Sequence, residues 1–263
     1  MGQMLIFGLG YAASHLAARL RARGWDVVGT TQDGRGDSLA FGDERAVLAV
    51  LRSATHILSS VPPVAGTDPV LARYGDAIAV APATWVGYLS STGVYGDAGG
   101  AWVDEGAPVT GRRADRNAAD AAWQALRGDV AVFRLPGIYG PGRSILDRIN
   151  EGRAHRIALP DQVFSRVHVD DIAGGVIASF KGPAGIYNLA DDEPGHQNRL
   201  VEWGCAMLGA PLPPLQTLDE AGLSPAARAF YAENRRVANG KAKRLLSWTP
   251  RFPTYREGLA ACR

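Results

Sequence analysis

Small residues near the amino terminus have the types and spacing that suit the binding of a dinucleotide. In the run Gly8-Leu9-Gly10-Tyr11-Ala12-Ala13, Gly8 permits a tight turn and Gly10 lets the backbone approach a pyrophosphate. Ala13 stands where a third small residue lets a helix pack closely on a strand, and N–H groups at the helix start could face the phosphates. We therefore expect Gly8, Gly10, Tyr11 and Ala13 to bind a nucleotide, although a tight turn without a ligand is the plainer interpretation.

The surrounding pattern supplies the elements that this turn requires. Residues 4–7 are apolar and predict a short buried strand. After the turn, four apolar residues share one face of a predicted helix: Ala13, Leu16, Ala17 and Leu20. Residues 25–29 predict a second strand. A strand, a glycine turn, a helix and a strand within about 30 residues are the setting of a dinucleotide fingerprint.

The end of the second strand bears on the choice of cofactor. Sites that prefer NAD place an Asp or Glu there, on the ribose 2′-hydroxyl. Here Thr30 and Thr31 precede the first carboxylate, Asp33. Either threonine could bind a 2′-phosphate and Arg35 could supply positive charge, or these polar residues simply begin a loop. The strand end therefore favours NADP over NAD.

A third strand is predicted over residues 55–59 and ends in two serines, a valine and two prolines. In a doubly wound sheet the carboxyl end of this strand passes close to the adenosine ribose and the pyrophosphate. We therefore add Ser59, Val61 and Pro62 to the predicted cofactor site.

The bulk composition is that of an ordinary soluble protein. The chain has 263 residues, of which 46% are apolar and 21% are charged, and its formal net charge is +2. Scattered positive residues give no support to nucleic acid as a partner. Cys205 and Cys262 lack metal-ligand spacing, so we expect no metal and a reducing compartment. No run approaches the roughly 20 apolar residues of a membrane span, and the first residues do not form a signal peptide. We expect a cytoplasmic protein with no membrane partner and leave a homodimer open.

Further segments follow one another in the order found in one enzyme family. Ser91-Thr92-Gly93-Val94-Tyr95-Gly96-Asp97 comes after a buried strand over residues 85–90, and a Tyr-Gly-Pro-Gly loop lies within residues 134–143. Arg166-Val167-His168-Val169-Asp170-Asp171 and the ending over residues 239–250 come later. Together these segments resemble the extended short-chain dehydrogenases/reductases, the NAD(P)-dependent epimerase/dehydratase family, over nearly the whole chain.

The resemblance implies an α/β fold in which a Rossmann doubly wound parallel sheet carries a small carboxy-terminal substrate lobe. Residues 1–142 would form the NAD(P)-binding domain. Residues 143–263 would mostly form the lobe that binds an unknown small molecule, with a segment at about 165–185 returning to the Rossmann core. Asp170 or Asp171 should cap the helix in that segment.

The resemblance also implies roles for side chains beyond the glycine turn. Ser91 matches the serine or threonine that hydrogen-bonds the reacting oxygen, with a polar residue that merely ends a strand as the alternative. The other predicted site residues fall into two groups. Ser90, Pro136 and Tyr139 belong to the cofactor site, the last two near the nicotinamide, and Arg143, Arg166 and His168 lie on the substrate side. Arginines there would suit an anionic ligand, although a generally arginine-rich surface explains them as well.

The Tyr-x-x-x-Lys pair that the family uses for acid/base chemistry does not occur in this chain. None of its three lysines has a tyrosine four residues before it. The resemblance places Arg112 and Arg116 at the tyrosine and lysine positions, on a helix predicted within residues 111–126. A guanidinium does not deprotonate in proteins, so Arg112 cannot replace the tyrosine as an acid. Arg116 could hold the nicotinamide ribose or neutralise developing charge, or both arginines could lie in solvent.

Two functions remain open on this basis. The first is an oxidoreductase, epimerase or dehydratase that uses NADP or NAD, with Ser91 orienting a carbonyl and either Tyr139 or His168 as the candidate acid. The second is a dinucleotide-binding sensor or regulatory protein with little or no catalysis. Ser91 and the Tyr-Gly-Pro-Gly loop favour the enzyme, and the missing pair favours the sensor.

Overall fold

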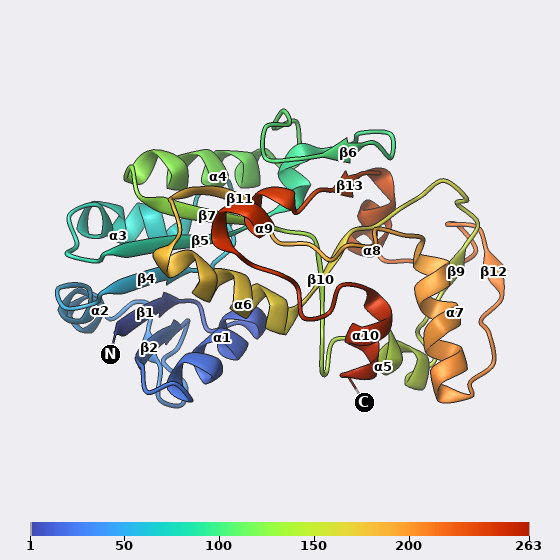
Figure 1. The fold of residues 1–263 in the computed structure, drawn as a ribbon, viewed down its shortest axis with the longest axis horizontal. Coiled ribbons are helices and arrows are strands. Elements are labelled where there is room, and N and C mark those ends of the chain that lie inside the picture. The colour runs from blue at the N-terminus through green and yellow to red at the C-terminus, as the bar shows by residue number, and fades with distance from the viewer. Residues whose placement is uncertain (1, 263) are drawn as a thin grey trace.

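Parallel strands form one central sheet in the computed structural model, which describes residues 2–262 (Figure 1). Within those residues the sheet has seven strands in the order β11-β7-β5-β4-β1-β2-β3. Their bounds are β1 Gln3–Phe7, β2 Asp26–Thr31, β3 Leu39–Ala40, β4 His56–Ser59, β5 Trp85–Ser91, β7 Val130–Leu135 and β11 Gly185–Asn188. Neighbouring strands all pair in parallel. The predicted α/β doubly wound sheet is confirmed.

Helices cover both faces of this sheet. One face carries α1 Tyr11–Arg21, α6 Val169–Ala178 and α9 Gly240–Leu246, and the other carries α2 Glu44–Leu51, α3 Pro69–Ala79 and α4 Ala114–Leu126. The apolar stripe predicted for α1 is confirmed by its buried residues, Ala13, Leu16, Ala17 and Leu20. Burying one leucine contributes about 1.5–3 kcal/mol, so such stripes hold the helices on the sheet. No helix within residues 2–262 is both long and apolar enough to cross a bilayer.

A second group of elements lies beside the sheet (Figure 1). It contains α5 Ile145–Asn150, β9 Arg156–Ile157, α7 Gln197–Leu208, β12 Leu215–Gln216, α8 Pro225–Ala229 and α10 Tyr255–Ala260. Short parallel ladders occur between β8 Gly137–Tyr139 and β10 Arg166–His168, between β6 Trp102–Val103 and β13 Arg236–Val237, and between β9 and β12. Single 3-10 turns are η1 Thr92–Tyr95, η2 Ser179–Lys181 and η3 Phe230–Ala232. The chain therefore passes repeatedly between the sheet and this second group.

The strand order reverses at β1, which lies between β4 and β2. In open parallel sheets, ligands bind at the carboxyl ends of the strands where the order reverses. Gly8 follows β1, Thr31 ends β2 and Ser59 ends β4. The fold therefore brings the predicted cofactor residues to one edge of the sheet.

Helix α4 begins later than the sequence pattern suggested. Its first residue is Ala114 and its N-cap is Arg113. The N–H of Gly111 instead donates to the carbonyl of Val94 at 2.8 Å. Because this bond ties the chain to η1, Arg112 lies in the loop before α4 rather than on the helix.

The predicted caps of α6 are wrong. The N-cap is His168, whose Nδ1 accepts the N–H of Asp170 at 3.2 Å. The carboxylate of Asp171 accepts the backbone N–H groups of Arg251 and Phe252 at 2.6 and 3.1 Å. Asp171 therefore binds the segment before α10, a contact that no local pattern reveals.

Candidate active site

The turn after β1 requires glycine at its first position. Gly8 has a φ of +82°, which residues with a Cβ rarely adopt, and a Cβ there would lie 2.7 Å from Cγ2 of Val61. The N–H of Gly8 donates to Oγ1 of Thr30 at 3.1 Å, and the Ser60 hydroxyl donates to the Gly8 carbonyl at 2.5 Å. Thr30 is 1% exposed. Its hydroxyl therefore braces the turn from inside the protein.

Gly10 leaves an open approach to the start of α1. It is exposed, and a Cβ placed on it would meet no heavy atom within 4 Å. Gly10 is the N-cap of α1, without a side-chain cap, and its carbonyl accepts the N–H of Ser14 at 2.8 Å. Helix geometry leaves the first N–H groups of α1, from Tyr11 to Ala13, without intrahelical partners. Together with the helix dipole, these groups suit an anion beside the turn.

A surface hollow of about 440 Å³ opens at the end of β2. Its lining residues are Leu9, Arg21, Thr31, Arg35, Asp37 and Ser38. Thr31 Oγ1 accepts the N–H groups of Gly34 and Arg35 and lies 2.7 Å from Oγ of Ser38. The Arg35 side chain is exposed beside Asp33. The hollow therefore combines two arginines and hydroxyls with one carboxylate, that of Asp37.

Residues at the ends of β4 and β7 also line the carboxyl edge of the sheet. Ser59 is fully buried, and its Oγ accepts the N–H of Val61 at 3.4 Å. Val61 is half-buried against Gly8, and Pro62 is exposed. Pro136, directly after β7, is half-buried. Val61, Pro62 and Pro136 therefore offer surface to a ligand, whereas Ser59 supports the loop.

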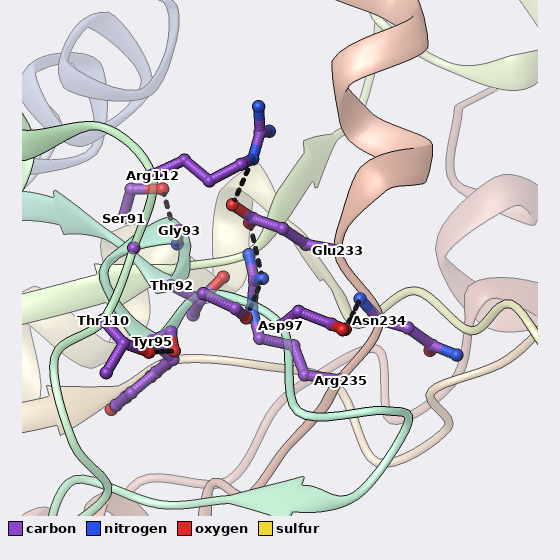
Figure 2. A network of polar contacts seen from close by, with 12 residues as sticks. Ser91, Thr92, Gly93, Tyr95, Asp97, Thr110, Arg112, Glu233, Asn234 and Arg235 are labelled. Carbon is purple, nitrogen blue, oxygen red and sulfur yellow. Dashed lines mark hydrogen bonds and ion pairs between the residues drawn. The ribbon is translucent and has the colours of Figure 1, made fainter.

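Ser91 stands at the last position of β5 with a hydroxyl that can still donate. Its Oγ accepts the N–H of Gly93 at 3.1 Å and so caps η1 (Figure 2). The side chain is half-buried, and its O–H has no acceptor among residues 2–262. Ser91 can therefore donate to a substrate oxygen while its lone pair holds the turn.

A buried ion pair behind Ser91 joins β5, β7 and α4. Asp120 accepts from Nε and Nη2 of Arg134 at 3.1 and 2.7 Å, and from the hydroxyl of Ser90 at 2.5 Å. The guanidinium also lies 4.9 Å from the ring centre of Tyr95. Ser90 therefore holds α4 against the sheet, with its hydroxyl already engaged.

The two arginines at the positions of the missing pair have different surroundings. Arg112 donates from Nε to Oε1 of Glu233 at 2.7 Å and from Nη2 to the carbonyl of Ala229 at 2.9 Å (Figure 2). Arg116 lies half-buried in the first turn of α4, and its guanidinium has no hydrogen bond or ion pair with any residue from 2 to 262. Burial lowers the pKa of Arg116. Of these two arginines, Arg116 is therefore the one whose guanidinium is left to bind a ligand.

The loop after β8 closes against the start of α1. Tyr11 donates its hydroxyl to the carbonyl of Pro141 at 3.0 Å, and the Arg143 guanidinium lies 5.5 Å from the Tyr11 ring centre. Burial raises the pKa of Tyr11 to about 12. Tyr139 is buried against Gly258, its hydroxyl has no partner among the described residues, and burial raises its pKa as well. Neither phenol is set to exchange a proton near neutral pH.

Arg166 and His168 lie inside the protein rather than on an open surface. Arg166 donates to the carbonyls of Phe164 and Gly195 and to Oε1 of Gln197. His168 is almost fully buried, and burial lowers its pKa to about 4, so the ring is neutral at physiological pH. Both side chains join segments of the fold, and neither faces solvent.

Asp191 is a buried acid that sequence reasoning missed. It is 2% exposed, and neither carboxylate oxygen accepts a well-aligned hydrogen bond within residues 2–262, although the backbone N–H of Glu193 lies close enough to lower its pKa. Burial raises the pKa of Asp191 to about 8, although the nearby Arg166 guanidinium opposes this shift. Asp191 begins a run of three acidic residues, and nothing in that run indicates which one is buried. Across the described residues, no group of three or more His, Cys, Asp or Glu side chains could hold a metal ion.

The parallel sheet and the glycine turn at its switch point define a Rossmann-type fold of the kind that binds dinucleotides. No family model matches the chain. Protein YeeZ of Escherichia coli (strain K12) is 30% identical over 230 residues, which cover 76% of this chain and 81% of YeeZ. A 3-diazoavenalumate denitrifying reductase of a Streptomyces species is 32% identical over 142 residues, 49% of this chain and 45% of the reductase.

Solved structures extend this likeness to the whole fold. A conserved protein of unknown function from Silicibacter pomeroyi DSS is 42% identical, with a TM-score of 0.91 over 100% of this chain and 98% of that protein. MoeE5 in complex with UDP-glucuronic acid and NAD is 22% identical (TM-score 0.79; 99% and 97% covered), and human epimerase family protein SDR39U1 with NADPH is 19% identical (0.79; 98% and 97%). The last two show the fold alone. The chain belongs to one family with YeeZ and the Silicibacter pomeroyi protein, and its fold is that of NAD-dependent epimerase/dehydratase structures.

Proposed function

We propose that the protein binds NADPH or NADH along the carboxyl edge of the sheet and transfers hydride between it and a small-molecule substrate. The observation that carries this proposal is the open start of α1 at Gly10, which stands at the switch point of the sheet. The NAD bound to MoeE5 and the NADPH bound to the human protein support a dinucleotide on this fold.

The residues present fit such a dinucleotide. The N–H groups at the start of α1 would receive the pyrophosphate, and Arg116 would reach the nicotinamide ribose. The hollow at the end of β2 would receive the adenosine ribose. Arg35 supports a 2′-phosphate there, whereas Asp37 opposes one and the Thr31 hydroxyl is already engaged by Gly34, Arg35 and Ser38. We favour NADPH, and we expect Arg35→Ala to weaken NADPH binding while leaving NADH binding unchanged.

The site can orient and polarise a substrate, but neither Tyr139 nor His168 is set to act as its general acid. A bound nicotinamide ring supplies or accepts hydride. Ser91 would donate a hydrogen bond to the substrate oxygen, and Arg116 would offset negative charge that develops there. Tyr139 and His168 are enclosed, and their pKa values are shifted away from neutrality in opposite directions.

A strongly electrophilic substrate fits a site of this kind. General acid catalysis typically contributes about 10²–10⁴-fold, and a hydride acceptor that is already electron-poor depends less on it. The Streptomyces relative is a reductase named for 3-diazoavenalumate, a diazo compound, which supports this class of substrate. We therefore propose reduction of an activated, electron-poor group rather than of a simple ketone.

Oxidation of NADPH in the presence of activated carbonyl and diazo compounds tests this proposal. With an activated carbonyl substrate, Ser91→Ala should lower turnover by about 10²–10³, the usual loss for one hydrogen-bond donor to a developing oxyanion, with dinucleotide affinity unchanged. Unchanged turnover would remove Ser91 from the chemistry.

A dinucleotide-binding sensor is the second candidate function. The enclosed positions of Tyr139 and His168 and the engagement of Arg112 by Glu233 favour it. Saturable binding of NADPH with no turnover of any substrate in the panel would select the sensor.

A further inference from the structure

A nearly buried carboxylate lies between two arginines, one of which follows the turn that Ser91 caps (Figure 2). Oε1 of Glu233 accepts from Nε of Arg112 at 2.7 Å, and Oε2 accepts from Nη1 of Arg235 at 2.7 Å. The Glu233 side chain is 11% exposed. Burial opposes its ionisation, but hydrogen bonds from Arg235 and Arg112 hold the pKa of Glu233 below its usual value. The carboxylate is therefore ionised and held by both guanidiniums.

Arg112 is directed to this position by the turn that Ser91 caps. The residue before it, Gly111, donates its N–H to the carbonyl of Val94 at 2.8 Å, and Ser91 accepts from Gly93 of the same turn. A Cβ on Gly111 would lie 2.2 Å from the carbonyl oxygen of Gly93. The close backbone approach fixes Gly111 against η1, the turn that follows β5, and Arg112 is the next residue in the chain.

Arg235 is anchored independently of Glu233. Its Nη1 also donates to the carbonyl of Gly96 at 2.6 Å, and the next residue back, Asn234, donates its N–H to Oδ1 of Asp97 at 2.8 Å (Figure 2). The carbonyl of Asn234 accepts from the N–H of Ala98 at 3.0 Å. Because Arg112 also donates to the carbonyl of Ala229 at 2.9 Å, both guanidiniums keep a backbone partner if the Glu233 side chain rotates away.

The Arg112 and Arg235 guanidiniums converge on one point and so form a site for an anion. In this structure the carboxylate of Glu233 occupies that site. Guanidinium groups recognise carboxylates and phosphates by paired, charge-assisted hydrogen bonds. Arg112 stays protonated and cannot transfer protons, which leaves it the role of a fixed positive charge next to the turn that Ser91 caps. We propose that Arg112 and Arg235 bind an anionic group of the substrate, a carboxylate or a phosphate, and that Glu233 occupies their site until the substrate displaces it. This inference rests on the proposed function, because only that function makes the anion a part of the substrate.

Glu233→Gln tests the displacement directly. Glutamine keeps the size of the side chain but removes the competing charge. Benzoate and phenyl phosphate serve as probes because they share a ring and differ in the anionic group, so their relative affinities identify the preferred group. We expect Glu233→Gln to bind at least one probe more tightly than the wild type by calorimetry. The gain should be on the order of tenfold, the lower end of the contribution of a hydrogen bond to a charged group.

Arg112→Gln and the double variant Arg112→Gln/Glu233→Gln test whether Arg112 is needed for probe binding. Both should lose the binding that Glu233→Gln gains. Glu151→Gln, at an exposed ion pair with Arg153, is the matched control and should bind both probes as the wild type does. A Glu233→Gln protein that binds both probes no better than the wild type would overturn the proposal, because a purely structural ion pair predicts that result.

A second measurement covers a Glu233→Gln variant that fails to fold. Probe binding should raise the Tm of the wild type by mass action, and Arg112→Gln should abolish that rise. An equal rise in both proteins would overturn the proposal. NADPH titration of the same proteins separates the two claims: absent NADPH binding rejects the proposed function, whereas the anion result concerns Arg112 and Glu233 alone.

Discussion

Replacing Asp120 by asparagine should destabilise the protein far more than the same change at an exposed aspartate. Asp120 accepts from Ser90 at 2.5 Å, from Gln124 at 2.6 Å and twice from Arg134 at 2.7 and 3.1 Å. The Arg134 and Asp120 side chains are 2% and 1% exposed. Asparagine keeps the shape but leaves the buried guanidinium without a counter-charge and turns an N–H₂ group toward donors.

The loss of stability in Asp120→Asn corresponds to a fall in Tm of several degrees. Removing one partner of a buried ion pair costs about 3–5 kcal/mol. At about 2.1 cal/mol/K per residue, a chain of 263 residues has an unfolding entropy of about 0.55 kcal/mol/K. A loss of about 4 kcal/mol therefore lowers the Tm by about 7 °C.

Thermal unfolding followed by circular dichroism measures this shift. Asp219→Asn is the matched control, because the Asp219 side chain is 85% exposed in its ion pair with Arg228. Exposed pairs contribute about 0–1 kcal/mol, so the Tm of the control should change by less than about 2 °C. Equal shifts in the two variants would refute the assignment of Asp120 as the buried counter-ion of Arg134.

Three further predictions concern other groups near the site. Gly8→Ala should lower the Tm, because its φ of +82° disfavours a Cβ and Val61 lies 2.7 Å from where that atom would be; an unchanged Tm would contradict the strained turn. Arg116→Gln should keep the wild-type Tm yet weaken NADPH binding on the order of tenfold, and fluorescence titration would expose unchanged affinity. Asp191→Asn should flatten the pH dependence of stability. With its pKa raised to about 8, native Asp191 keeps a proton that the unfolded chain releases near pH 4, so wild-type stability falls by up to about 1.4 kcal/mol per pH unit between about pH 4 and about pH 8. Urea unfolding across that range measures this slope, and equal slopes in both proteins would contradict it.

The fold could be predicted because its signals are local. Short apolar runs predict the buried strands, and the stripe on α1 has helical spacing. The residues of the glycine turn, from Gly8 to Ala13, occupy adjacent positions in the chain. Each of these features is encoded within about one turn or strand, so a single sequence suffices to recognise it.

The polar contacts of the site could not be predicted because they join distant segments. Arg112 meets Glu233 across 121 positions, and the side chain of Arg116, four residues later, meets no acceptor in the described chain. Nothing in the local sequence separates these two arginines. The burial of Arg166 and His168 likewise depends on packing between segments, which periodicity in one strand does not report.

Titration of NADPH and NADH into the wild type and into Gly10→Ala tests the central claim most directly. Gly10 has a φ of −82° and open space where a Cβ would stand, so alanine should leave the Tm unchanged. Its methyl group would nevertheless occupy the approach of the pyrophosphate to α1. The account predicts saturable binding of at least one dinucleotide to the wild type and clearly weaker binding to Gly10→Ala. No binding to the wild type at millimolar concentration, or equal affinity in the two proteins, would contradict it.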